Sequence, residues 1–115
     1  MTEEGEIQIF RALNFIRDNA PAYAKAKAER IYLENYRKSK KALLMRKAES
    51  EGQKTAALQE RDAYADGEYM QVLDGLRDAV EEEERLRWLM TAAEARIEVW
   101  RTLESSRRTE RKVIP

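Results

Sequence analysis

The chain has no cysteine and no histidine among its 115 residues. Disulfides, thiolate nucleophiles, Cys/His zinc sites and imidazole acid–base chemistry are therefore excluded. The chain also lacks the glycine-rich phosphate loops and the Ser-His-Asp set that mark common enzyme classes. We therefore expect a protein that is not an enzyme and that needs no cofactor and no metal.

Turn-forming residues are scarce as well, with four glycines and two prolines. No stretch alternates apolar and polar residues for long, so strands joined by tight turns are poorly supported. Charged residues make up 38% of the chain, well above the roughly 25% of ordinary domains. This balance favours long exposed helices, and we expect a single helical domain of the all-α class.

No apolar run approaches the roughly 18 residues that span a bilayer. The opening residues, MTEEGEIQIF, carry acidic side chains where a secretory signal carries basic ones. We therefore expect a soluble, cytoplasmic protein with no membrane partner.

The first half of the chain predicts two helices. Apolar residues at helical spacing predict a short helix over residues 7–19. Asn19 and Pro21 should end it, because the residue before a proline disfavours helical geometry and asparagine caps a following helix well. A second helix is predicted over residues 21–65, with Gly52 as the position where it could kink.

The apolar face of this second helix is broad. Leu33 and Leu44 fall outside it, so some apolar surface should face elsewhere. The residues that share the main arc are Ala28, Ile31, Tyr32, Tyr36, Ser39, Ala42 and Leu43.

Asp66 and Gly67 give the clearest turn signal, with Asp66 as the cap of a third helix over residues 68–108 and a tail over 109–115. This helix carries a heptad pattern with one polar interruption, at Glu83. We therefore expect a long antiparallel helical hairpin, packed as a coiled coil, with the short first helix at its open end. The heptad positions are Tyr69, Leu76, Glu83, Met90 and Ile97, alternating with Val72, Ala79, Leu86, Ala93 and Trp100.

A second apolar stripe runs along the same helix, about 100° or more from the heptad positions. One face of the helix can meet the second helix, so the other needs a different neighbour. Either the first helix covers it or a second copy does, and because a slim hairpin buries little surface, we expect a homodimer that forms a helical bundle. This apolar stripe consists of Trp88, Ala92, Ala95, Val99 and Leu103.

Charge is segregated although the net charge is zero. Residues 25–47 carry +7, residues 48–84 carry −9 and residues 85–112 carry +4. Around the predicted turn, Lys41 would face the neighbourhood of Ala92, so the opposite charges would miss each other within one chain. They could meet between the chains of an offset dimer, or stay solvated.

The basic segment is a candidate for contact with nucleic-acid phosphates, with Tyr32 and Tyr36 nearby as stacking groups. No recognition-helix, zinc-finger or RNP pattern accompanies it. The acidic run Glu81–Glu84 is not a metal site, because consecutive helical carboxylates point in different directions. The nucleic-acid candidates are Arg37, Lys38, Lys40, Lys41, Arg46 and Lys47.

Three stretches resemble small uncharacterised early-region proteins of temperate bacteriophages, which are neighbours of single-strand annealing recombination genes. They are YAKAKAERIYLENYRKSKKALLMRKAE, QERDAYA and LRWLMTAAEARIEVWRTLESSRRTE. The resemblance covers most of the chain from Asn19 onward and implies a phage origin, a host bacterial cytoplasm and a role near DNA metabolism. It supplies no functional residues.

The function expected from these features is that of a non-enzymatic phage accessory protein in DNA recombination or replication. It would act as a helical dimer that binds DNA or a phage or host DNA-processing protein. The alternatives are an inhibitor of a host nuclease or defence complex, whose acidic end imitates a phosphate backbone, and a purely structural scaffold.

Overall fold

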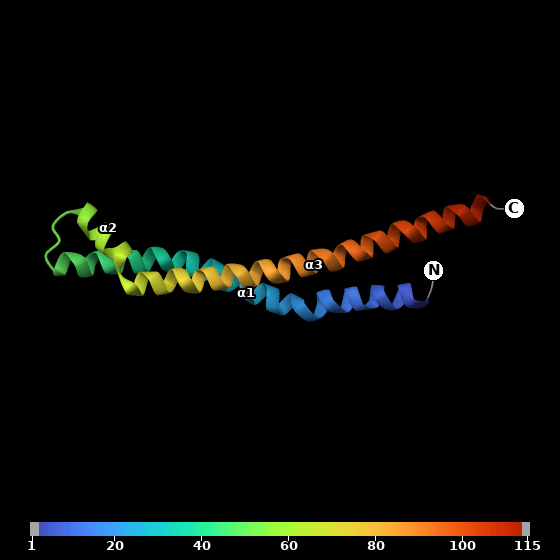
Figure 1. The fold of residues 1–115 in the computed structure, drawn as a ribbon, viewed down its shortest axis with the longest axis horizontal. Helices are drawn as coiled ribbons and strands as arrows, with labels where there is room; N and C mark the ends of the chain where they lie inside the picture. The colour runs from blue at the N-terminus through green and yellow to red at the C-terminus, as the bar shows by residue number, and fades with distance from the viewer. Residues whose placement is uncertain (1–2, 114–115) are drawn as a thin grey trace. The chain divides into compact units, whose positions relative to one another are not determined.

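The computed structural model describes residues 3–113, which form three α-helices and, over that stretch, no strand. The helices are α1 (Glu3–Ser50), α2 (Ala56–Ala65) and α3 (Gly67–Val113). Figure 1 shows α1 and α3 running in opposite directions, with α2 and its loop where the chain reverses. The predicted all-α class and the antiparallel helical hairpin are confirmed.

The chain divides into two compact units, where the sequence predicted one domain. We call residues 3–23 with 84–113 the terminal unit, and residues 24–83 the loop unit. Each unit contains one stretch of α1 and one of α3, and α2 belongs to the loop unit. None of the three helices, over the residues described, combines the length and hydrophobicity that a bilayer span requires.

The predicted helix boundary at Asn19 and Pro21 is wrong, because α1 continues through Pro21. Asn19 does not cap a new helix. Its side-chain amide instead donates to the carbonyl of Phe15, 2.9 Å away. A proline inside a helix removes one backbone hydrogen bond. Ile16 and Tyr23 are partly buried on either side of it. Packing on both sides therefore outweighs the local cost.

The second predicted helix is also interrupted, because α1 ends at Ser50 and α2 begins only at Ala56. Gly52 has φ of 108°, a left-handed conformation that glycine adopts without steric cost. Thr55 then caps α2, its Oγ1 accepting from the backbone N–H of Leu58 at 3.2 Å. Gly52 is thus the site of a chain reversal and not of a kink.

Asp66 caps α3 as predicted. Its Oδ1 accepts from the backbone N–H of Glu68 at 2.8 Å, and α3 begins at Gly67, one residue earlier than expected. At the other end α3 runs to Val113, beyond the predicted end at 108. The predicted tail therefore lies largely within α3, apart from residues 114 and 115, which fall outside the described residues.

The heptad pattern of α3 marks its packed face correctly. All ten heptad positions from Tyr69 to Trp100 are buried or half-buried, Glu83 included. In the loop unit, Tyr69 joins a small core with Leu44 and Ala63, so that α1, α2 and α3 all contribute to it. The 3-4 spacing thus places a continuous row of side chains against α1, as coiled-coil packing requires.

The predicted packed face of α1 is wrong. Tyr32 and Leu43, which lie on the predicted arc, are 61% and 55% exposed, whereas Leu33 is half-buried and Leu44 buried. The packed face of α1 has its own 3-4 spacing, but several of its positions are polar. Long basic side chains can occupy such positions because their aliphatic stems pack well. The packed face of α1 is therefore not the most apolar face of that helix. The packed positions in the loop unit are Ala26, Arg30, Leu33, Arg37, Lys40, Leu44 and Ala48.

The register of α1 against α3 also differs from the prediction. Lys40 pairs with Glu68 at 3.4 Å, although the expected turn would have placed this part of α1 opposite Ala92. The register is shifted because α1 ends at Ser50 and the loop and α2 follow it in the sequence before α3 begins at Gly67. The first turns of α3 therefore lie opposite the last turns of α1. Basic and acidic segments therefore meet within the loop unit, contrary to the expectation that they miss each other.

Candidate functional site

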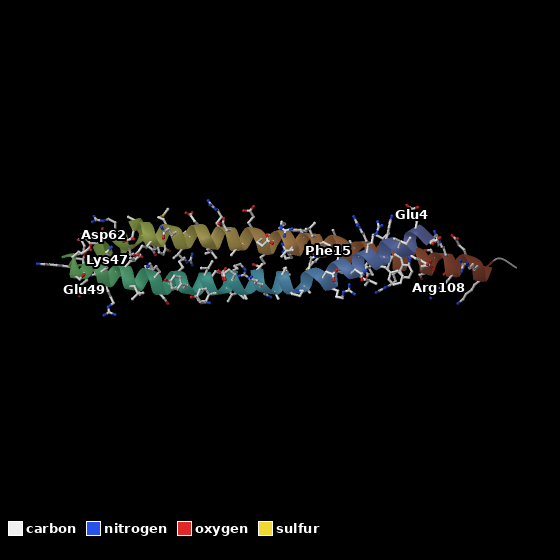
Figure 2. All side chains as sticks on the ribbon, turned by 90° about the horizontal axis from the view of Figure 1, so that it is seen from below. Glu4, Phe15, Lys47, Glu49, Asp62 and Arg108 are labelled. Atoms are coloured by element: carbon white, nitrogen blue, oxygen red, sulfur yellow. The ribbon has the colours of Figure 1, made fainter. Side chains whose placement is uncertain are left out.

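Three of the six nucleic-acid candidates are held in ion pairs within the loop unit. Lys41 Nζ lies 3.0 Å from Glu60 and 4.7 Å from the ring centre of Tyr64. Lys40 pairs with Glu68, and Lys47 with an Asp66 oxygen at 3.5 Å. Figure 2 shows Lys47 and Asp62 together at the end where the chain reverses. Much of the charge offered to a phosphate backbone is thus neutralised by α2 and the start of α3.

The other three candidates differ from one another in exposure. Arg37 is half-buried on the packed face of α1, whereas Lys38 and Arg46 are exposed and have no ion pair among residues 3–113. Tyr32 and Tyr36 stack on each other, with ring centres 5.9 Å apart. The structure therefore does not gather the six basic side chains into one free surface.

The ion pairs around α2 predict a pH dependence. The hydrogen bond from Lys41 lowers the pKa of the Glu60 carboxyl, and the backbone N–H of Glu68 lowers that of Asp66. A carboxyl whose pKa is lower in the folded state stabilises the fold above its unfolded pKa, and this stabilisation is lost as pH falls through the folded value. We expect the free energy of unfolding to decrease as pH is lowered from about 5 towards 3.

Urea denaturation at several pH values measures this dependence. The Glu60→Gln/Asp66→Asn variant should show a flatter decline than the natural chain. Glu81→Gln, at an exposed carboxylate with no ion pair among the described residues, is the matched control and should leave the slope unchanged. If the free energy of unfolding falls equally steeply with pH in all three proteins, Glu60 and Asp66 are not the cause of the pH dependence.

A buried ion pair in the loop unit was not foreseen from the sequence. Glu83, the polar interruption of the heptads, is 6% exposed. Both of its oxygens accept from the Arg30 guanidinium, from Nε to Oε2 and from an Nη to Oε1 at 3.1 Å. Arg30 also donates to Glu34 at 3.1 Å. Its hydrogen bonds to the carboxylates of Glu83 and Glu34 raise the pKa of Arg30 above its ordinary value. The only sequence signal was a carboxylate at a heptad position.

The apolar stripe of α3 lies uncovered in the terminal unit. Trp88, Val99 and Leu103 are 60%, 59% and 52% exposed, and Ala92 and Ala95 are exposed as well. The N-terminal part of α1 packs on the heptad face instead, through Ala12 and its neighbours. The alternative in which the first helical segment covers the stripe is therefore wrong.

The stripe borders an open groove between α1 and α3 of the terminal unit, with a volume of about 390 Å³. Trp100 forms part of its wall, and the indole Nε1 is buried without an acceptor among the described residues. None of the described residues that line the groove carries a carboxylate. Its lining consists of Gly5, Gln8 and Ile9 from α1 and of Ala95, Arg96, Val99, Trp100, Leu103 and Arg107 from α3.

A second hollow of about 250 Å³ continues from this groove along the terminal unit, since Arg96 lines both. Arg11 and Phe15 from α1 and Leu89 and Ala92 from α3 are among its lining residues. Arg11, Arg96 and Arg107 have no ion pair among residues 3–113. The terminal unit thus offers a long apolar surface with arginines along it.

The described residues contain no group of three or more acidic side chains placed to hold a metal ion. Comparison with protein-family models, with curated proteins and with solved structures found no match for this chain.

Proposed function

We propose that this chain is a non-enzymatic accessory protein that acts as a helical homodimer, associating through the apolar stripe of α3. The observation that carries the proposal is the exposure of Trp88, Val99 and Leu103 on a helix whose other face is already packed. Burying a large apolar side chain contributes about 1.5–3 kcal/mol. Three such residues in each copy, each little more than half exposed, supply a driving force that offsets the entropic cost of association.

The proposed setting is the DNA recombination or replication of a temperate phage, on the strength of the resemblance to phage early-region proteins. Within that setting we favour contact with a DNA-processing protein over contact with DNA. Three basic candidates, Lys40, Lys41 and Lys47, already pair with carboxylates of their own chain. Inhibition of a host nuclease or defence complex would use the same kind of protein contact.

Sedimentation equilibrium of the natural chain over a range of concentrations tests the self-association. A mass of twice 13.5 kDa at micromolar concentration is the expected result. A monomer at every concentration, with the far-UV signal of a folded helical protein, would overturn the proposal.

DNA binding is the second candidate, favoured by the exposure of Lys38 and Arg46. Any affinity of the basic segment for single-stranded DNA should depend on both of these side chains. Lys38→Glu/Arg46→Glu is therefore expected to weaken DNA binding and to reduce the slope of log affinity against log salt concentration by about 1–2. Filter binding from 50 to 200 mM salt measures it. Reversing Lys40 or Lys41 is a poor test, because each holds a carboxylate of its own unit.

The control for this test is Lys25→Glu/Lys27→Glu, which reverses two exposed basic side chains of α1 away from the candidates. If both double variants reduce binding equally, the binding is non-specific electrostatic attraction. If the natural chain does not bind DNA at 50 mM salt, DNA contact is eliminated and the protein partner remains.

A further inference from the structure

The five residues of the apolar stripe have a near-symmetric arrangement along α3. Trp88 and Leu103, the large residues, stand at its two ends, and the small residues Ala92 and Ala95 lie between them. The midpoint of the stripe falls between Ala95 and Arg96. Reversing the direction of the helix about this midpoint exchanges Trp88 with Leu103 and Ala92 with Val99. Such a stripe can therefore pack against a reversed copy of itself.

We propose that a second copy of this chain covers the stripe with its own stripe, the two α3 helices packing antiparallel about a twofold axis beside Ala95. The inference rests on the proposed self-association and adds its geometry. Ala95 beside the axis, with Ala92 one helical turn away, allows the two backbones to approach closely, as small residues do at helix interfaces. A twofold axis makes the contact closed, since the same patch is used on both copies.

The groove of the terminal unit gives the end residues a place to pack. In this alignment Trp88 of each copy meets Leu103 of the other. Leu103 lines the groove together with Val99 and Trp100. The exposed indole of Trp88 would therefore enter an apolar hollow of about 390 Å³, where aromatic anchors usually contribute most to an interface.

The charges along α3 favour the antiparallel direction over the parallel one. Apart from Glu83, which is buried and paired with Arg30, residues 78–84 carry four acidic and no basic side chains, and residues 107–112 carry four basic and one acidic. Reversal about Ala95 brings the first segment of each copy opposite the second segment of the other. A parallel pair would place like charges together at both ends, which is unfavourable. The groove also favours the antiparallel direction, because Arg107 is among its described lining residues and none of those residues carries a carboxylate.

Single-cysteine variants test the geometry directly, because the chain has no cysteine of its own. At the axis, Ala95→Cys should form an intermolecular disulfide under mild oxidation. Leu103→Cys should not, because in the antiparallel pair the two copies of this position lie about 22 Å apart, at 1.5 Å per residue. An equimolar mixture of Trp88→Cys and Leu103→Cys proteins should cross-link, giving mixed disulfides.

The control is Lys38→Cys, exposed on α1 of the loop unit, which should cross-link only at the rate of random collisions. Leu103→Cys that cross-links as fast as Ala95→Cys would show a parallel pair and overturn this inference, while the dimer itself would stand. Equal rates for Ala95→Cys and Lys38→Cys would also overturn it. A natural chain that sediments as a monomer would instead overturn the proposed self-association.

Discussion

Arg30→Leu is expected to lower the free energy of unfolding clearly, because the Glu83 carboxylate would stay buried without its partner. Glu83→Leu should lower the free energy of unfolding clearly less than Arg30→Leu does. Arg30 would keep its hydrogen bond to Glu34, and a quarter of its side chain already reaches solvent. Urea denaturation followed by circular dichroism measures both variants.

The double variant Arg30→Leu/Glu83→Leu should recover most of the loss, since replacing both members of a buried ion pair with apolar residues is often neutral or stabilising. Arg77→Leu is the matched control, at an arginine of the same unit whose side chain is 73% exposed. It should change stability by no more than about 0.5 kcal/mol. Equal effects of Arg30→Leu and Arg77→Leu would contradict the burial of Glu83 as the cause.

Trp88→Ala with Leu103→Ala should weaken the dimer by roughly a thousandfold or more, because each dimer loses four large side chains. Large side chains that anchor an interface often cost about 2 kcal/mol each on truncation, and tenfold in affinity corresponds to about 1.4 kcal/mol. Helix content should change little, because both side chains are more than half exposed in the single chain. Sedimentation equilibrium measures the affinity, and circular dichroism measures the helix content.

The matched control is Ile31→Ala with Leu43→Ala, which truncates two exposed apolar residues on α1. The dimer should keep its affinity in this variant. If the α1 variant weakens the dimer and the α3 variant does not, the association surface is on α1 and the apolar stripe has another role.

The sequence predicted the α3 helix well because its packed face is also its most regular apolar face. Ten heptad positions with a single polar member leave little choice of face. The same reasoning identified the apolar stripe, whose exposure agrees with the interpretation that it needs a neighbour outside the chain. Asp66 was found because a capping aspartate has a local signature that does not depend on packing.

The sequence misled at α1 for a physical reason. Arg30, Arg37 and Lys40 occupy packed positions there, while Ile31 and Tyr32 face outward. A hydrophobicity pattern ranks faces by composition and cannot anticipate that a basic side chain is matched by a carboxylate far along the chain. Arg30 and Glu83 lie 53 residues apart, so their pairing depends on register.

The register of α1 against α3 depends on the chain reversal at Gly52. The residues around Gly52 did not show whether the chain would bend or reverse there. A glycine in a helix-rich stretch permits a bend, a frayed turn or a complete reversal, and the choice depends on tertiary packing. Here α2 buries Ala63 against Leu44 and Tyr69, and that contact favours reversal. The ion pairs of the basic segment follow from the same event, and they engage Lys40, Lys41 and Lys47 with carboxylates of their own chain.

The short loop over residues 51–55 is a suitable site for inserting another sequence. Because the long helices are aligned by contacts such as Lys40 to Glu68, extra residues in this loop need not slide one helix past the other. Lengthening a flexible connection costs only about 0.6 kcal/mol per doubling. An affinity tag or a fluorescent domain could therefore be spliced in there, leaving both chain ends and the apolar stripe untouched.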